Sequence, residues 1–534
     1  MKHYNTKMYI VALAIFASVA FTACTDYGKP TLSANKLSAI LHIIGNQYVD
    51  TVDMEDLVEK TIPKVLAELD PHSVYIPAKK AEESNQELRG SFSGIGIQFM
   101  IQSDTIYVSD VIHGGPAEKV GLMAGDRIVT IDDSLYVGKK ISNDGAMKRL
   151  KGPKGSEVRL GIKRHGEKEL LPYVIVRGNI PVKSIDATYL IDDRWCYIKI
   201  NKFGETTYPE MLIALAQGIQ KGMQGCIIDL RGNTGGYMGA AIQMVNEFLP
   251  KGEMIVYTEG KDVPRDEMYA TGGGSCQKTP LVVLTDETSA SASEIFAGAI
   301  QDNDRGTIIG RRTFGKGLVQ QPIELGDGSA IRLTIARYYT PSGRCIQKPY
   351  TNGHNEEYEL DLLNRFEHGE FFTQDSIKQD ESHIYYTSLG RPVYGGGGIM
   401  PDIFVPQDTT GVTSYFSMAV NRGLTIQFSF QYTDKNRQKL QKYDNADDLL
   451  KYLKTQNILE KFAQFAESKG LKRRNILMNK SKALFERNLY GNIIYNMLNM
   501  EEYMKFLNQS DKTVLKAVEV LEKGESFPQA PEKS

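Results

Sequence analysis

The pattern of apolar and polar positions changes three times along the 534-residue chain. Over residues 37–69 apolar side chains recur at helical spacing, for example at Leu37, Ile40 and Ile44, until the sequence LDPHS interrupts the pattern. We therefore expect an N-terminal helical segment within residues 25–90.

Short runs of alternating apolar and polar residues, separated by glycine, follow over residues 91–177. They predict a small, partly open β-barrel around one short helix. Over residues 178–411 near-continuous apolar runs, such as Cys226–Leu230 and Leu281–Leu284, alternate with helical patterns. Such runs are typical of strands covered on both faces, so we expect an α/β core. A polar, tyrosine-rich stretch over residues 348–394 is interpreted as an insertion into that core.

Helical periodicity returns beyond residue 412, for example at Leu449, Leu450 and Leu453, and predicts a C-terminal helical domain over residues 412–534. Together the patterns predict a multidomain α/β protein. Its α/β core carries an inserted β-barrel and has helices on its N-terminal and C-terminal sides.

The first 24 residues have the features of a secretory signal peptide. Lys2 and Lys7 precede an apolar run over residues 8–20, and small residues lead to Cys24. The sequence FTAC resembles the lipobox of bacterial lipoproteins, with phenylalanine in place of the usual leucine. We therefore expect residues 1–24 to be a lipoprotein signal peptide and the mature chain to be periplasmic, held to a membrane of the cell envelope by a lipid on Cys24. A signal peptide without lipidation and an uncleaved anchor remain alternatives.

The composition narrows the classes of partner and cofactor. With 41% hydrophobic and 24% charged residues the chain is an ordinary globular protein, and its formal net charge of -2 offers no broad basic surface for nucleic acid. The cysteines form no CxxC pair and the histidines no HExxH motif, so no zinc site is expected.

Two stretches carry candidate chemistry. The first, TSASASEIFAGAI, places four hydroxyl groups before a helical pattern, at Thr288, Ser289, Ser291 and Ser293. Helix capping, with Ser291 and Glu294 at the spacing of a capping box, accounts for one of these hydroxyls and leaves the others to be explained.

The second stretch, GRRTFGKG, presents Lys316 between two glycines. Its GxxxxGK spacing fits the first part of a phosphate-binding loop, but Gly317 stands where a Mg²⁺-binding hydroxyl is required, which disfavours nucleotide binding. The alternative is a Ser–Lys pair. Burial lowers the pKa of a lysine, and the neutral amine can then take the proton of a serine hydroxyl.

The order of these motifs resembles that of the carboxyl-terminal processing peptidases, the tail-specific serine proteases. The matching sequences are LDPHSVYI, DLRGNTGG, TSASASEIFAGAI, RTFGKGLVQ, DGSAIRLTIARYYTPSGR and GGIMPDI, with GGPAEKVGLMAGDRIVTID similar to part of a PDZ domain. The resemblance covers about residues 35–405. It implies a core of the crotonase- or ClpP-like sheet-and-helix type.

The resemblance also implies roles for residues of the core. Ser291, the central serine of SASAS, is the nucleophile, Lys316 is the general base 25 residues later, and Gln320 orients that lysine. The oxyanion hole is implied at the backbone N–H of Ala292 and of one glycine in GNTGG, either Gly235 or Gly236. A helix N-terminus is suited to this because its first N–H groups are unpaired.

In the PDZ-like unit the resemblance implies capture of a peptide C-terminus by addition of a strand. The loop that binds the terminal carboxylate consists of Gly94, Ile95, Gly96 and Ile97. Asp229 and Arg231 of DLRGNTGG are interpreted as an ion pair that fixes the loop.

These inferences predict an exported serine endopeptidase that cuts proteins near apolar C-termini without a cofactor, with an adaptor and self-association left open. One alternative is a catalytically inactive PDZ scaffold or adaptor. Another is acyl-thioester chemistry of the crotonase type, which requires a coenzyme A site that an exported protein gives no reason to expect.

Overall fold

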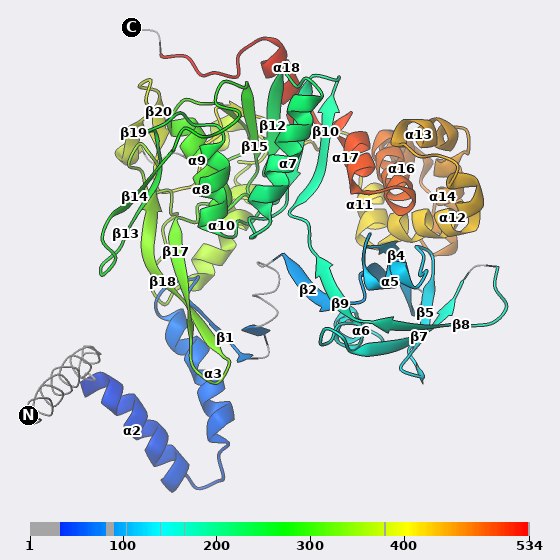
Figure 1. Cartoon of the computed structure of the whole chain (residues 1–534), viewed down its shortest axis with the longest axis horizontal. Coiled ribbons are helices and arrows are strands. Elements are labelled where there is room, and N and C mark those ends of the chain that lie inside the picture. Colours follow the sequence, from blue (N-terminus) through cyan, green and yellow to red (C-terminus); the bar gives the residue numbers. More distant parts are fainter. Residues whose placement is uncertain are drawn as a thin grey trace, which may run out of the picture. The chain divides into compact units, whose positions relative to one another are not determined.

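The computed structural model describes residues 32–78, 80–81, 90–102, 104–138, 140–164, 166–378 and 381–531 (Figure 1). The signal peptide and the lipidation site predicted within residues 1–24 lie outside them. The chain divides into two compact units, Met1–Leu69 and Asp70–Ser534. Of the helices that the structure describes, none combines the length and the apolar character of a membrane span.

The N-terminal unit contains two helices at the positions that the apolar spacing predicted, α2 (Leu32–Gln47) and α3 (Met54–Ala67). Asp53 caps α3 by accepting the N–H of Asp56, and the helix continues through Pro63.

A six-stranded sheet is the centre of the second unit, and its strands are ordered β10-β11-β12-β15-β16-β21. The strands from β11 to β21 are parallel, and β10 is antiparallel at one edge. The bounds are β10 (Ile185–Ile191), β11 (Trp195–Ile200), β12 (Gly225–Asp229), β15 (Leu281–Thr285), β16 (Thr307–Gly310) and β21 (Ile403–Phe404).

Helices cover both faces of this sheet, as its apolar strands predicted. On one face Ile198 and Ile228 share a core with helices α7 (Thr207–Gln220), α8 (Met238–Asn246) and α9 (Ala292–Asp302). The alternate residues, such as Tyr197 and Ile227, pack on the other face against Val514 and Ala517 of α18 (Lys512–Glu522). The last described helix is therefore part of the α/β core.

A second sheet carries Gln320, the residue predicted to orient the base. Its strands are ordered β1-β18-β13-β14, and β17 pairs with β18. Strand β1, at the end of LDPHSVYI, lies beside β18, and Gln320 of β17 pairs with Thr334 of β18. The bounds are β1 (Val74–Ile76), β13 (Met254–Glu259), β14 (Asp266–Tyr269), β17 (Leu318–Glu324) and β18 (Ala330–Tyr339).

The predicted PDZ-like unit is a separate small sheet with a core of its own, ordered β3-β4-β5-β7-β8 with β6 on β5. Strands β2 (Ser91–Gly94) and β9 (Gly178–Pro181) pair where the chain enters and leaves it. The other bounds are β3 (Ile97–Gln102), β4 (Thr105–Val111), α5 (Pro116–Lys119), β5 (Arg127–Ile131), β6 (Ser134–Leu135), α6 (Asn143–Leu150), β7 (Glu157–Lys163) and β8 (Leu171–Val176).

The predicted insertion contains α10 (Asn355–Glu367), two short 3₁₀ turns and the hairpin of β19 (Ile384–Tyr386) and β20 (Pro392–Tyr394). Seven further helices share a core, whereas α18 packs on the α/β sheet. They are α11 (Ser414–Asn421), α12 (Leu424–Leu440), α13 (Ala446–Lys454), α14 (Ile458–Ser468), α15 (Asn475–Lys480), α16 (Lys482–Met497) and α17 (Met500–Asn508). The α/β core with an inserted barrel and flanking helices is thus confirmed.

Candidate active site

Ser291 lies at the sharp turn between β15 and α9. Its backbone has φ 57° and ψ -114°, a conformation that residues other than glycine rarely adopt. Ser291 is partly exposed, although every residue of α9 behind it is buried. A strained turn from strand to helix that exposes a serine is the geometry that presents a nucleophile in other hydrolases.

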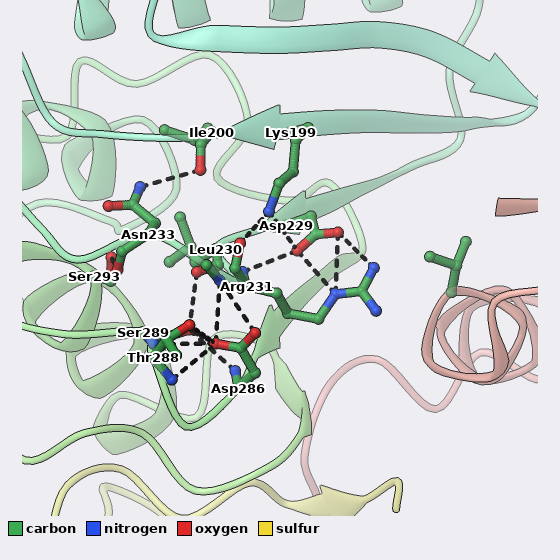
Figure 2. A network of polar contacts seen from close by, with 12 residues as sticks. Lys199, Ile200, Asp229, Leu230, Arg231, Asn233, Asp286, Thr288, Ser289 and Ser293 are labelled. Carbon is green, nitrogen blue, oxygen red and sulfur yellow. Dashed lines mark hydrogen bonds and ion pairs between the residues drawn. The ribbon is translucent and has the colours of Figure 1, made fainter. Parts of the chain in front are cut away.

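The neighbouring serines hold this turn in place. Ser289 Oγ donates to the carbonyl oxygen of Leu230 at 2.8 Å, and Ser293 Oγ donates to that of Asn233 at 2.9 Å (Figure 2). Both bonds join the serine-rich loop to the loop of GNTGG. The cluster of hydroxyls therefore contains structural members on either side of Ser291.

Lys316 lies in the loop between β16 and β17. Its Nζ donates to Gln320 Oε1 at 3.0 Å, and Gln320 Nε2 donates in turn to the carbonyl oxygen of His72 in LDPHS. Burial lowers the pKa of Lys316 below the usual lysine value of 10.5, and the positive charge of Arg332 acts in the same direction. At a given pH a larger fraction of Lys316 is therefore neutral than of a solvated lysine, and the neutral amine can accept a proton.

A buried carboxylate ties the loop of Ser291 to the loop of Lys316. Glu294 accepts the N–H groups of Ser291 at 2.9 Å, Gly315 at 2.7 Å and Lys316 at 2.8 Å, and the hydroxyl of Thr313 at 2.5 Å. Burial raises the pKa of Glu294, while these hydrogen bonds oppose the rise. The N–H groups of the GxxxxGK loop thus face a carboxylate of the protein itself, which leaves no support for a phosphate there.

Tyr338 makes a second link between the two loops. Its hydroxyl oxygen lies 2.5 Å from the carbonyl oxygen of Lys316 and 3.0 Å from that of Ser291, and the two carbonyls share its single proton. Within the described part of the chain, no hydrogen bond joins the Ser291 hydroxyl to Lys316 Nζ. The backbones of the two loops are joined by Glu294 and Tyr338, and catalytic hydrogen bonds commonly tighten only when substrate binds.

Sequence patterns did not identify these linking residues. Glu294 was expected only as the partner of Ser291 in a capping box, and the carboxylate half of that box is present. The capping-box spacing was the one available signal. It did not indicate contacts with residues 313–316.

The glycines of GNTGG lie directly against Ser291. Gly235 has φ 103° and Gly236 has φ 142°, and a Cβ at Gly235 would lie 2.7 Å from Cβ of Ser291. The N–H of Gly235 donates to Asn233 Oδ1 at 2.9 Å. In the described residues the N–H groups of Gly236 and Ala292 have no such acceptor. Of the two glycines, Gly236 is therefore the one with a donor available for an oxyanion.

The predicted ion pair of DLRGNTGG is confirmed. Arg231 Nη2 lies 2.7 Å from Asp229 Oδ2, and Lys199 Nζ lies 3.3 Å from the same carboxylate (Figure 2). The hydroxyl of Tyr197 also donates to it, at 2.7 Å. Burial alone would raise the pKa of Asp229, but the charges of Arg231 and Lys199 and the hydrogen bonds hold it well below the usual range. The carboxylate is therefore charged at neutral pH.

The predicted carboxylate-binding loop precedes an edge strand. Gly96 has φ 80°, and Ile95 is 3% exposed in the core of the PDZ-like sheet. Gly94 ends β2 and Ile97 begins β3, so only Ile95 and Gly96 lie between the two strands. Strand β3 lies at the end of the strand order among the described strands. An edge strand beside a glycine-containing loop is the arrangement that strand addition requires.

Three family models match the sequence. Peptidase family S41 matches residues 194–356, the PDZ domain matches residues 84–163, and a family of unknown function, DUF8443, matches residues 415–499.

Several known proteins are similar to the chain. The carboxy-terminal-processing protease of Bartonella bacilliformis is 39% identical over 315 residues, which make up 58% of this chain and 71% of that protein. The carboxy-terminal processing protease CtpB of Bacillus subtilis is 34% identical over 335 residues, 62% of this chain and 69% of that protein. Among solved structures, the photosystem II D1 C-terminal processing protease is 23% identical with a TM-score of 0.35, covering 70% of this chain and 93% of that one.

The first two relatives share at least a third of their aligned residues with this chain over more than two thirds of their own length. The chain is therefore a serine-type peptidase of family S41 and belongs, with its PDZ domain, to the carboxy-terminal processing proteases.

Proposed function

We propose that this protein is an exported, lipid-anchored endopeptidase that cuts proteins near their C-termini by a Ser–Lys mechanism. The observation that carries the proposal is the joint arrangement of Ser291 and Lys316. A serine exposed on a strained turn and a lysine whose pKa is lowered by burial have their loops bound to one carboxylate, that of Glu294.

In the acylation step Ser291 Oγ attacks the scissile carbonyl carbon while the neutral Nζ of Lys316 takes the hydroxyl proton. The carbonyl oxygen becomes an oxyanion, to which the N–H groups of Ala292 and Gly236 donate. Lys316 then gives the proton to the departing amine, the C–N bond breaks, and an acyl-serine remains. A water molecule, deprotonated by Lys316, attacks this ester. The bond from the acyl carbon to Ser291 Oγ breaks, Lys316 returns the proton to Oγ, and the shortened chain leaves with a new C-terminal carboxylate.

Gln320 and Gly235 have supporting roles in this scheme. Gln320 Oε1 orients Nζ of Lys316, and its own amide is held by the carbonyl of His72. Gly235 gives its N–H to Asn233, so we assign it the close approach of the loop to Ser291 rather than a bond to the oxyanion.

The PDZ domain would deliver the substrate. An apolar tail adds to the edge of β3, and its terminal carboxylate binds the N–H groups of the loop Gly94–Ile97. Support for this step comes from the edge position of β3 and the left-handed backbone of Gly96. Support for export and for the lipid on Cys24 comes from the sequence of residues 1–24.

The direct test is cleavage of a poorly folded test protein by the soluble form that starts after Cys24. Ser291→Ala and Lys316→Ala are expected to abolish cleavage, and an apolar C-terminal tail is expected to be preferred over a charged one. Ser468→Ala, which removes an exposed hydroxyl in the C-terminal helices, is the matched control and is expected to keep the chemistry. Equal cleavage by the wild type, Ser291→Ala and Lys316→Ala would contradict the Ser–Lys assignment. Tail binding without any cleavage would favour an inactive scaffold.

A further inference from the structure

We propose that Asp511, the residue before α18, is a positioning residue for this peptidase. Through Arg231 it holds the loop 230–236, which lies against Ser291. The inference rests on the proposed function and adds to it a residue from the C-terminal helices, outside the motifs that the chain shares with its family.

The guanidinium of Arg231 lies between two carboxylates. Its Nη1 donates to both oxygens of Asp511, at 3.0 Å each, and its Nε and Nη2 donate to Asp229 at 2.7 to 3.2 Å. The two-nitrogen contact with Asp229 fixes the plane of the guanidinium, and the bonds from Nη1 hold its far end at Asp511. Arg231 therefore cannot shift unless one of the two pairs breaks.

Lys199, Asp229, Arg231 and Asp511 form a cluster whose positive and negative charges are equal in number only when Asp511 is present. Lys199 and Arg231 are offset by Asp229 and Asp511, and the side chains of Arg231 and Asp511 are only 18% and 21% exposed. Removing one partner from a pair at this depth leaves a charge that solvent compensates poorly.

Backbone N–H groups of α18 hold the carboxylate of Asp511 in place. Its Oδ1 accepts the N–H groups of Thr513 and Val514 at 3.0 Å each and so caps α18. Val514 and Ala517 of that helix are buried against the α/β sheet. The carboxylate is thus anchored to the sheet by a packed helix, and it presents a fixed position to Arg231.

From Arg231 the contacts continue to the nucleophile. The next residue, Gly232, donates its N–H to the carboxylate of Asp286 at 3.1 Å, and the carbonyl oxygen of Asn233 accepts the N–H of Ala290 at 3.0 Å. Asp286 and Ala290 both belong to the loop that ends at Ser291. A displacement of Arg231 is therefore transmitted to the two loops that supply the proposed oxyanion donors and nucleophile.

The test separates this role from helix capping. Asp511→Ser keeps a capping hydroxyl but is too short to reach Arg231, and Asp511→Asn keeps the cap and one acceptor without the charge. The matched control is Glu522→Gln, which breaks the exposed ion pair between Arg194 and Glu522 on the same helix.

We expect Asp511→Ser to lower kcat by about 10- to 100-fold with KM changed less than about twofold, because a small misplacement of reacting groups acts on the transition state. Binding of a peptidyl aldehyde, which forms a tetrahedral adduct with Ser291, should weaken by a similar factor. Asp511→Asn should be intermediate, and Glu522→Gln should behave as the wild type.

Hydrogen exchange supplies a readout that needs no activity. Amides of residues 230–236 and 286–293 should exchange faster in Asp511→Ser and be unchanged in Glu522→Gln. Unchanged kcat, aldehyde affinity and exchange in Asp511→Ser would overturn the inference, and so would equal losses in Glu522→Gln. If the wild type has no peptidase activity, the proposed function fails, and the positioning role is still decided by the exchange of the two loops.

Discussion

Replacing Glu294 by glutamine should test how far the catalytic geometry depends on one buried carboxylate. Each carboxylate oxygen accepts two donors, Oε1 from Thr313 and Gly315 and Oε2 from Ser291 and Lys316. The glutamine amide places an NH₂ group against one of these pairs. A buried donor left unsatisfied costs about 1–3 kcal/mol, so two cost about 2–6 kcal/mol. Because the Thr313 hydroxyl can rotate, we expect a value near the lower end.

The same change should lower activity by more than stability alone explains. Ser291 and Lys316 lose their common acceptor, and a displacement of about 1 Å between reacting groups costs on the order of 10²-fold in rate. Urea unfolding followed by tryptophan fluorescence measures the first effect, and kcat on a tailed peptide substrate measures the second.

The control for this experiment is Glu460→Gln in the C-terminal helices. Glu460 pairs with Arg473 at 2.7 Å, and its side chain is 47% exposed. This variant should lose about 1 kcal/mol or less and keep its kcat. A Glu294→Gln protein with the urea midpoint and the kcat of the wild type would refute the idea that this carboxylate aligns the two loops.

Four further predictions concern the base, the residue that orients it and the PDZ loop. Burial lowers the pKa of Lys316, so kcat/KM should rise with pH, and the midpoint of the rise should lie below pH 10.5. A rate of peptide hydrolysis that does not change from neutral to alkaline pH would contradict the assignment of Lys316 as the base. Because the native state disfavours the protonated lysine, its free energy of unfolding should fall as pH drops from 10.5 through the lowered pKa. Lys316→Met should remove that dependence in urea titrations at several pH values. Gln320→Leu should lower kcat by about tenfold with little change in KM, as steady-state kinetics would show. Gly96→Ala, at φ 80° with Ile180 Cδ1 3.0 Å from the added Cβ, should weaken binding of apolar tail peptides measured by calorimetry and leave hydrolysis of short untailed peptides unchanged.

Periodicity and motif order predicted much of this molecule. The apolar runs Cys226–Leu230 and Leu281–Leu284 became β12 and β15 within one residue at each end. They are buried on both faces, as their lack of alternation indicated. These features can be predicted locally. Whether apolar residues alternate with polar ones in a strand depends on whether one or both of its faces are buried, and a few adjacent residues are enough to show the pattern.

The support of the candidate site could not be predicted in the same way. Gln320 bonds to the carbonyl of His72, and Arg231 bonds to Asp511, 248 and 280 residues away in the sequence. Every residue has a backbone carbonyl, so the sequence does not show which one accepts a bond from Gln320. An aspartate before a helix is explained by capping alone, so the sequence does not suggest a second partner for it. Only the fold shows that such groups also meet a second partner.

The packing of α18 on the central sheet has a consequence for the time at which the enzyme is completed. Strand β12 is made early, but the face that carries Ile227 stays open until the helix with Val514 and Ala517 has been synthesised. At a translation rate of about 5–20 residues per second, that interval is roughly 15–60 s. The active site of a nascent chain is then incomplete while its own unfolded segments are most exposed to cleavage. Synthesis of α18 therefore sets the earliest time at which the enzyme becomes active.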